Sequence, residues 1–231
     1  MAPLNERSMK YIIMCGGAYH KWEIPRQLQK IHGEEIVSRT IRLLRENGIE
    51  DIAISTNIPV FKRLGVPVLE HNNDFKVYAP WKTSGHWCDA FYPTDEPTCY
   101  LFGDVVFSPE AIKTIVETET DDIQFFASAP PFAEGYIKKW AEPFALKAVN
   151  TEHLKHAISL TKQYQDRGMF KRKPIMWELW QVIQAAPLNH IDYKSYVVIN
   201  DYTCDVDDEG DIARLEDAVM RYGKRAESNT E

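Results

Sequence analysis

The chain has 231 residues and an apolar content of 44%, which is enough for one sizeable domain and excludes an intrinsically disordered protein. Its formal net charge of -7 argues against non-specific nucleic-acid binding, which needs a basic surface. The longest apolar runs are too short for a membrane span and no signal-peptide pattern opens the sequence, so we expect a cytoplasmic protein.

The ends of the chain differ in pattern from its body. Residues 1–8 lack periodicity and are predicted to be an unstructured leader, 9–225 to form one domain, and 226–231 to be an unstructured tail. The four cysteines are scattered without metal-ligand spacing: Cys15, Cys88, Cys99 and Cys204. Without a secretory signal, they are expected to be free thiols.

Strand and helix patterns alternate along the domain. In the first half we predict a strand at 10–15, a helix over 36–46 that stops at Asn47-Gly48, and strands at 52–54 and 66–69. In the second half we predict a helix near 86–91, a strand at 98–103, a helix from Ser108-Pro109, strands at 123–130 and 144–150, helices from 151 and over 176–186, a strand at 196–201 and a helix over 211–224. This alternation is typical of a single α/β domain with a mostly parallel sheet.

The first predicted strand runs directly into Cys15-Gly16-Gly17-Ala18. Glycines let a backbone approach a ligand closely, and successive N–H groups can form an anion-binding concavity. The stretch is neither a Walker A loop nor GxGxxG, so a simple tight turn is the alternative interpretation.

Pro25 then stiffens the chain before Arg26. A guanidinium can bind two phosphate oxygens at once, although most arginines are solvated on the surface.

Carboxylates follow two predicted strands. Asp104 comes directly after the buried strand at 98–103, and Asp205 and Asp207 share a face of an extended segment. Since Mg²⁺ prefers one or two carboxylates together with phosphate oxygens, Asp104 and Asp207 could bind it. The alternative for the acidic run, which also contains Asp208, Glu209 and Asp211, is a favourable interaction with the dipole of the helix that follows.

The run from Asp205 also resembles an EF-hand loop, with Gly210 at the sixth position and Glu216 at the twelfth. A strand is predicted where an EF-hand needs a helix, and no second hand is present, so Ca²⁺ is the less favoured ligand.

These segments, in this order, resemble the nucleotidyltransferases that join a nucleoside triphosphate to a sugar phosphate or similar acceptor. The matching stretches are MCGGAYHKWEIPRQLQKIHGEEIVSRTIRLLRENGIEDIAIST, CYLFGDVVFSPEAI and DVDDEGDIARLE. The resemblance implies a Rossmann-like, GT-A-like α/β/α sandwich. It also implies Mg²⁺ as cofactor, a nucleoside triphosphate (CTP or UTP favoured) and a phosphorylated acceptor as partners, and leaves a homodimer open.

The resemblance also implies roles for individual residues. Cys15, Gly16, Gly17 and Ala18 would lie under the nucleotide phosphates, and Ser84 and Gly85 would line the base and ribose. Asp104 and Asp207 would hold the metal, and Asp104 would be catalytic with Arg26 and Lys21. Arg26 stands where the family has a catalytic lysine, and Lys21 could supply a further cation, because the loop lacks the family's second GxG glycine and its arginine.

The acceptor site is the least defined part. Lysines and an arginine accompany tryptophans in the central region: Lys138, Lys139, Lys147, Lys171, Arg172 and Lys173 beside Trp140, Trp177 and Trp180. A phosphorylated acceptor could use lysine and an aromatic surface, but solvated lysines and core tryptophans explain the pattern equally well. Lys147, in a predicted strand after Pro143, is the candidate acceptor-binding residue.

The sequence thus predicts a nucleotidyltransferase that releases pyrophosphate. The alternatives are a GT-A-type glycosyltransferase that uses a nucleotide-sugar, and a nucleotide-binding domain without catalysis.

Overall fold

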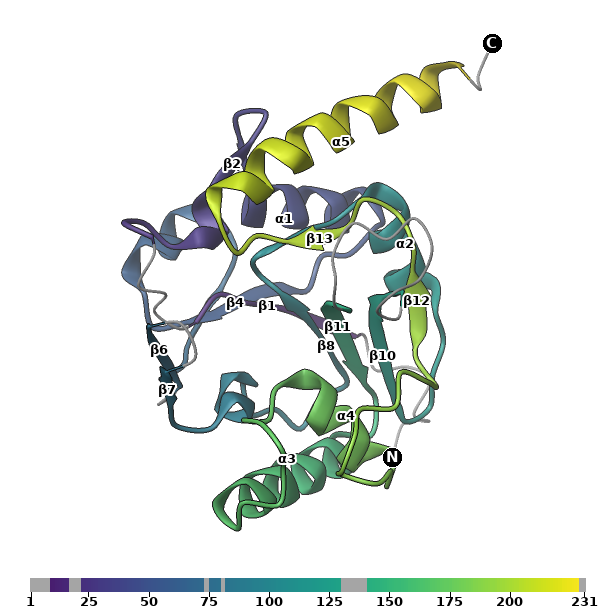
Figure 1. Cartoon of the computed structure of the whole chain (residues 1–231). Helices are drawn as coiled ribbons and strands as arrows, with labels where there is room; N and C mark the ends of the chain where they lie inside the picture. Colours follow the sequence, from purple (N-terminus) through teal and green to yellow (C-terminus); the bar gives the residue numbers. More distant parts are fainter. Residues whose placement is uncertain (1–8, 17–21, 73–74, 80–81, 130–140, 229–231) are drawn as a thin grey trace.

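The computed structural model describes residues 9–16, 22–72, 75–79, 82–129 and 141–228 (Figure 1). The predicted leader at 1–8 lies outside these residues, as do the last three residues of the predicted tail.

Among these residues, seven strands form the central sheet in the order β12-β10-β11-β8-β1-β4-β5. Their bounds are β1 (Lys10–Met14), β4 (Ile52–Thr56), β5 (Val68–Glu70), β8 (Thr98–Phe102), β10 (Ile123–Ser128), β11 (Pro143–Ala148) and β12 (Val197–Ile199). β11 is antiparallel to both of its neighbours, whereas the other paired strands are parallel. The predicted mostly parallel mixed sheet is confirmed, and the amino end of β11 lies at the same edge as the carboxyl ends of β8 and β10.

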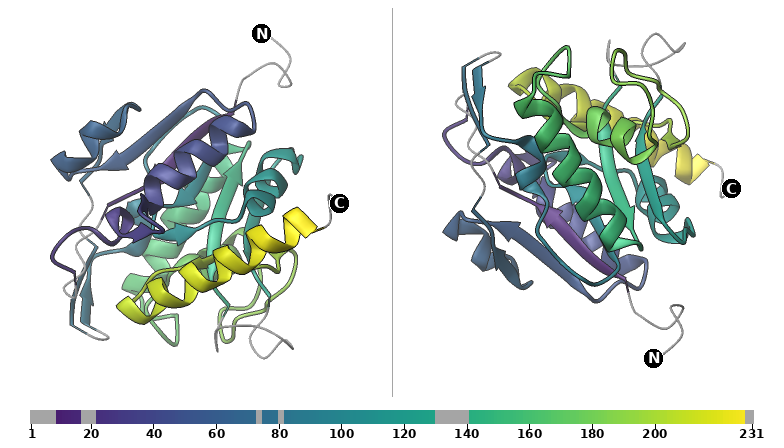
Figure 2. Two further views of the ribbon diagram at one scale, coloured as in Figure 1. Left: turned by 90° about the horizontal axis from the view of Figure 1, so that it is seen from above. Right: turned by 90° about the horizontal axis from the view of Figure 1, so that it is seen from below.

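Helices cover both faces of the sheet (Figures 1 and 2). One face carries α1 (Ile36–Glu46), α2 (Pro109–Glu117) and α5 (Glu209–Ser228), and the other carries α3 (Thr151–Asp166) and α4 (Met176–Ile183). The predicted α/β/α sandwich is therefore confirmed. None of the helices in the described part of the chain has the length and apolar character required to span a membrane.

The remaining elements are short. They are η2 (Arg26–Leu28), β2 (Lys30–Ile31), β3 (Glu34–Glu35), η3 (Pro59–Leu64), β6 (Lys76–Ala79), β7 (Lys82–Ser84), η4 (Trp87–Ala90), β9 (Val105–Val106) and β13 (Cys204–Asp205). η4 is the helix expected near 86–91, and it is a single 3₁₀ turn.

Local signals explain where the helices begin and end. At the start of α2 the Ser108 hydroxyl accepts a hydrogen bond from the Ala111 N–H at 2.9 Å, which confirms the predicted N-cap. α4 ends at Ile183, three residues earlier than predicted, because the chain takes a left-handed conformation at Ala185 (φ 50°) before Pro187. α5 continues to Ser228, three residues into the stretch predicted as tail.

Two apolar clusters hold these layers together. The larger lies between the sheet and its helices, and the smaller lies beneath α5. The smaller cluster contains Ile31, Ile36, Val106, Tyr202, Cys204, Val206 and Leu215. Because its residues come from β2, β9 and β13 as well as α5, this second core fixes the segments that surround the carboxyl edge of the sheet.

Candidate active site

A cavity of about 380 Å³ lies at the carboxyl ends of β1 and β8, where open α/β sheets bind ligands. Its polar lining includes Glu23, Arg26, Gln27, Asp104, Glu142 and Asp205, and its apolar lining includes Trp22, Phe75, Trp87 and Phe102. Residues from at least six separate stretches of sequence therefore meet at one edge of the sheet.

The predicted glycine loop contributes Gly16 to this cavity. Cys15 precedes it with its side chain fully buried in the core, and this burial, helped by the Asp104 carboxylate, raises the pKa of its thiol well above the usual value. Gly17, Ala18 and Lys21 lie outside the described residues.

Asp104 is held at the edge by a close approach of β8 to β1. The Gly103 N–H donates to the Met14 carbonyl at 3.1 Å. A Cβ atom at Gly103 would lie only 2.6 Å from that oxygen and 2.7 Å from the Cys15 sulfur. Only glycine fits this contact, and the contact fixes where the next residue, Asp104, leaves the sheet.

A two-stranded ladder brings the C-terminal acidic run to Asp104. β13 pairs antiparallel with β9, with Asp205 opposite Val105. Beyond it, the Val206 N–H donates to the Asp104 carbonyl at 3.0 Å. Segments about a hundred residues apart in the sequence thus place Asp104, Asp205 and Asp207 together.

The turn after Asp207 is stabilised by Asp211, which is 5% exposed. One Asp211 oxygen accepts from the backbone N–H groups of Asp207 at 2.8 Å and Asp208 at 3.2 Å, and the other pairs with Arg214 at 2.6 Å. Asp211 therefore serves the first turn of α5, as predicted for the helix-start alternative, and it orients Asp207.

Arg26 lies between two of these carboxylates. Its Nη2 atom forms an ion pair with Asp104, and its Nη1 atom lies 3.0 Å from an Asp207 oxygen and 3.3 Å from the Val206 carbonyl oxygen. The Arg26 and Asp104 side chains are 23% and 16% exposed. Arg26 is thus a partly buried member of the site rather than a solvated surface arginine.

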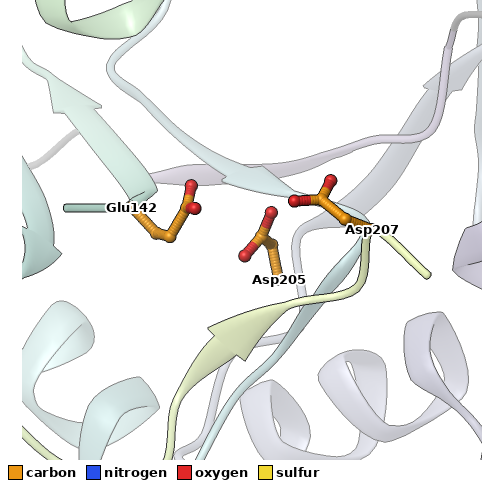
Figure 3. A group of neighbouring side chains, drawn as sticks. All are labelled: Glu142, Asp205 and Asp207. Carbon is orange, nitrogen blue, oxygen red and sulfur yellow. The ribbon is translucent and has the colours of Figure 1, made fainter. Parts of the chain in front are cut away.

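A further carboxylate, which the sequence did not predict, joins this acidic group. Figure 3 shows Glu142, Asp205 and Asp207 directed toward one another, and one oxygen from each lies within 4.8 Å of the others. Glu142 is 8% exposed, and its backbone is fixed by Ser128, whose N–H donates to the Glu142 carbonyl at 2.9 Å. In the sequence, the only indication of a role for Glu142 was its position just before the strand β11. Because β11 runs antiparallel to its neighbours, this position lies at the carboxyl edge of β8.

This donor set suits a hard divalent cation. Carboxylate oxygens are the protein ligands that Mg²⁺ prefers, and Asp104, Asp205, Asp207 and Glu142 supply them beside a cavity large enough for a phosphorylated ligand. The EF-hand alternative is not supported, because strand β13 precedes the run and the Glu216 carboxylate instead accepts from the His32 N–H at 3.0 Å.

Part of the cavity lining is aromatic. Trp87 of η4 packs edge-to-face against Phe102 at the end of β8, with ring centroids 5.7 Å apart. Such surfaces can bind a nucleobase or the apolar face of a sugar.

The structure does not bring Lys147 to this site. Lys147 is opposite Cys99 at the start of β8, which is the other edge of the sheet. Its buried ammonium donates to the carbonyls of Val116 at 3.1 Å and Thr118 at 2.7 Å, at the end of α2, and burial lowers its pKa. The expectation of an acceptor-binding lysine here is therefore replaced by a helix-capping lysine.

The predicted base-binding pair is also not part of the cavity lining among the described residues. Ser84 ends β7, and the carbonyl of Gly85 accepts from Gln165 of α3 at 3.2 Å. η4, which follows, supplies Trp87 and Ala90 to the lining instead.

The tryptophans of α4 are core residues. Trp177 and Trp180 are each 2% exposed, and their indole N–H groups donate to the carbonyls of Ala141 and Lys194. This agrees with the alternative in which they stabilise the fold. Trp140, Lys138 and Lys139 lie outside the described residues.

No protein-family model and no curated protein matches the sequence. Solved structures do match the fold. The inositol-1-phosphate CTP transferase from T. maritima aligns with 92% of this chain and 97% of its own, with a TM-score of 0.54 at 14% identity. A protein assigned as a glucose-1-phosphate thymidylyltransferase from Bacillus anthracis aligns with 90% of this chain and 94% of its own, also with a TM-score of 0.54 at 14% identity. The chain therefore shares the fold of these nucleotidyltransferases, as the sequence resemblance implied.

Proposed function

We propose that this protein is a Mg²⁺-dependent nucleotidyltransferase, which transfers a nucleoside monophosphate from a triphosphate to a phosphorylated small molecule and releases pyrophosphate. The observation that carries the proposal is the contact of Arg26 with Asp104 and Asp207 at the edge of the cavity. These residues were predicted from their sequence context, and they meet in a fold shared with nucleotidyltransferases.

The chemistry requires positive charge and alignment more than a side-chain nucleophile. A phosphate oxygen of the acceptor forms a bond to the α-phosphorus, the bond from that phosphorus to the bridging oxygen breaks, and pyrophosphate leaves with the electron pair. Because both reactants are anions, a cation must offset their repulsion. Arg26 can bind two phosphate oxygens, and the backbone at Gly16 allows phosphates to approach.

Asp104 and Asp207 would hold the metal, with Glu142 and Asp205 close enough to Asp207 to add oxygens or to orient metal-bound water. When bound, Mg²⁺ supplies charge neutralisation of the phosphates.

The printed names of the two structural neighbours support a choice of first substrates. Both name pyrimidine nucleotides, CTP and thymidylyl, and both name a phosphate ester of a cyclic polyol. We therefore propose the pyrimidine triphosphates CTP, dTTP and UTP as the first to test, with sugar phosphates and inositol phosphates as acceptors.

The test is pyrophosphate release in the presence of Mg²⁺ from CTP, UTP, GTP, ATP and dTTP, each paired with the acceptor panel. Release that needs one triphosphate and one acceptor is the expected result. Transfer from a nucleotide-sugar without pyrophosphate would instead identify a glycosyltransferase, and triphosphate binding without turnover on any acceptor would favour a non-catalytic domain.

Substitution of the metal carboxylates tests the assigned roles. We expect Asp104→Asn and Asp207→Asn each to lower kcat/KM by about a hundredfold or more, because each removes a charged oxygen ligand. Asp217→Asn is the matched control, since Asp217 pairs with Arg221 on the surface of α5 and should leave kcat/KM unchanged. Full activity of Asp104→Asn would exclude the proposed metal role.

A further inference from the structure

Arg26 already places a positive charge between the two carboxylates assigned to the metal. Its two terminal nitrogens contact Asp104 and Asp207 separately, and one of them also contacts the Val206 carbonyl oxygen. A single guanidinium therefore spans the gap between the end of β8 and the turn before α5.

This bridge depends on the shape of arginine. A planar guanidinium presents several N–H donors in fixed directions, so it can hold two acceptors at once, whereas a lysine ammonium is a compact point charge. A lysine at this position could therefore not reproduce both contacts of Arg26 in the same geometry.

The contact and metal binding are in competition. Arg26 contacts one oxygen of Asp104 and one of Asp207, so a divalent cation held by both carboxylates would lie close to the guanidinium. Two cations at such short range repel one another strongly. The side chains are partly buried, so water screens the ion pair less than it would on the surface. Arg26 can leave the two carboxylates when another anion offers its guanidinium two oxygens in a similar geometry. A triphosphate is such an anion.

We propose, resting on the proposed function, that Arg26 is an internal counter-cation. In the nucleotide-free protein it holds Asp104 and Asp207 together and keeps metal affinity low. When a triphosphate binds its guanidinium, the two carboxylates become available to Mg²⁺. Metal and nucleotide binding are then coupled, and by linkage each raises the affinity for the other by the same factor.

The test measures metal binding without nucleotide, with Mn²⁺ as the probe followed by electron paramagnetic resonance. Four proteins are compared: the wild type, Arg26→Lys, Arg26→Gln and the control Arg63→Gln. Arg63 pairs with Glu35 outside the cavity lining, so this variant removes the same charge without touching the bridge. Thermal unfolding of each variant shows that it is folded.

We expect Arg26→Lys and Arg26→Gln to bind Mn²⁺ about tenfold to a hundredfold more tightly than the wild type, which is the size of one charged hydrogen bond. Arg26→Lys is decisive because it keeps the net charge and loses only the bridge. Arg63→Gln should match the wild type. Equal Mn²⁺ affinity in the wild type and Arg26→Lys would overturn the inference.

The pyrophosphate assay separates this inference from the proposed function. If the wild type turns over but Arg26→Lys binds Mn²⁺ no more tightly, the inference is wrong and the function stands. If Arg26→Lys binds Mn²⁺ more tightly but no triphosphate yields pyrophosphate, Arg26 does displace metal and the proposed reaction is wrong.

Discussion

Lys147 lies in a strand of the central sheet, yet its charge serves the fold. Its ammonium is buried and satisfies two carbonyls at the end of α2, which otherwise have no partner within the helix. A charged residue in a predicted strand suggested a ligand contact. The carbonyl oxygens that bind it could not be identified from the sequence, because α2 and β11 are separated by β10 along the chain.

Replacing this lysine should affect stability and leave catalysis intact. We expect Lys147→Met to lower the free energy of unfolding by about 1–3 kcal/mol, because the two carbonyls lose their donor. Pyrophosphate release by the folded variant should keep the wild-type KM for the acceptor. Denaturant unfolding and steady-state kinetics measure the two effects, and Lys62→Met, at an exposed lysine, is the control. A raised acceptor KM with normal stability would restore the acceptor-binding role.

The other site residues could be predicted only where the neighbouring sequence was recognisable. Asp104 and Asp207 were predicted because each follows a recognisable strand, and Arg26 because a proline and a matching helix frame it. Glu142 lacks such a frame, so its place in the site needed the structure. The contact of Arg26 with both aspartates is likewise a three-dimensional property, since 78 and 181 positions separate it from them.

At the scale of elements, the contact between β1 and β8 decides where the site lies. Gly103 lets the end of β8 approach the Met14 carbonyl, and Asp104 follows immediately. A side chain at position 103 would push the end of β8 away from the backbone of β1. Neither strand can shift easily, because both lie in the closely packed centre of the sheet.

We therefore expect Gly103→Ala to destabilise the protein by about 1–3 kcal/mol, the usual cost of overpacking, and also to lower pyrophosphate release by displacing Asp104. Gly48→Ala gives the contrast. Gly48 has φ +77° and open space around it, so alanine there should cost about 1 kcal/mol through backbone strain alone and leave kcat unchanged. Thermal unfolding with parallel kinetics tests both, and normal activity in Gly103→Ala would contradict this account.

The direction of β11 in the sheet could not be predicted from the sequence. Its apolar pattern predicted a strand, but strand direction depends on how the chain returns to the sheet, and the stretch before it (130–140) lies outside the described residues. Local periodicity carries no information on that return.

At the scale of the whole molecule, the layer order could be predicted because helices and strands alternate with clear periods. The apolar face of each helix can then be buried against the sheet, which places helices on the two faces of the sheet. The second apolar cluster beneath α5 could not be predicted, because its residues come from β2, β9, β13 and α5, which are far apart in the sequence.

The reactivity of the four cysteines can show whether the whole domain is folded. All are free and buried, they come from separate parts of the chain, and burial raises the pKa of Cys88 and Cys99 to about 12. We expect iodoacetamide at pH 8 to leave the native protein unlabelled over a time in which the denatured chain gains four labels, as counted by mass spectrometry. Rapid labelling of one cysteine in the native protein would show that its region opens without global unfolding.

The pairing of β13 with β9 has a consequence for biosynthesis. Asp104 and the strands β1, β4 and β8 leave the ribosome long before Asp205 and Asp207 are synthesised. Until then β9 has no partner in its ladder, and the apolar residues that later lie beneath α5 have nothing to cover them. The nascent protein can therefore pair β1, β4 and β8 early, but the carboxylates of the proposed metal site can meet only after translation has passed Asp207.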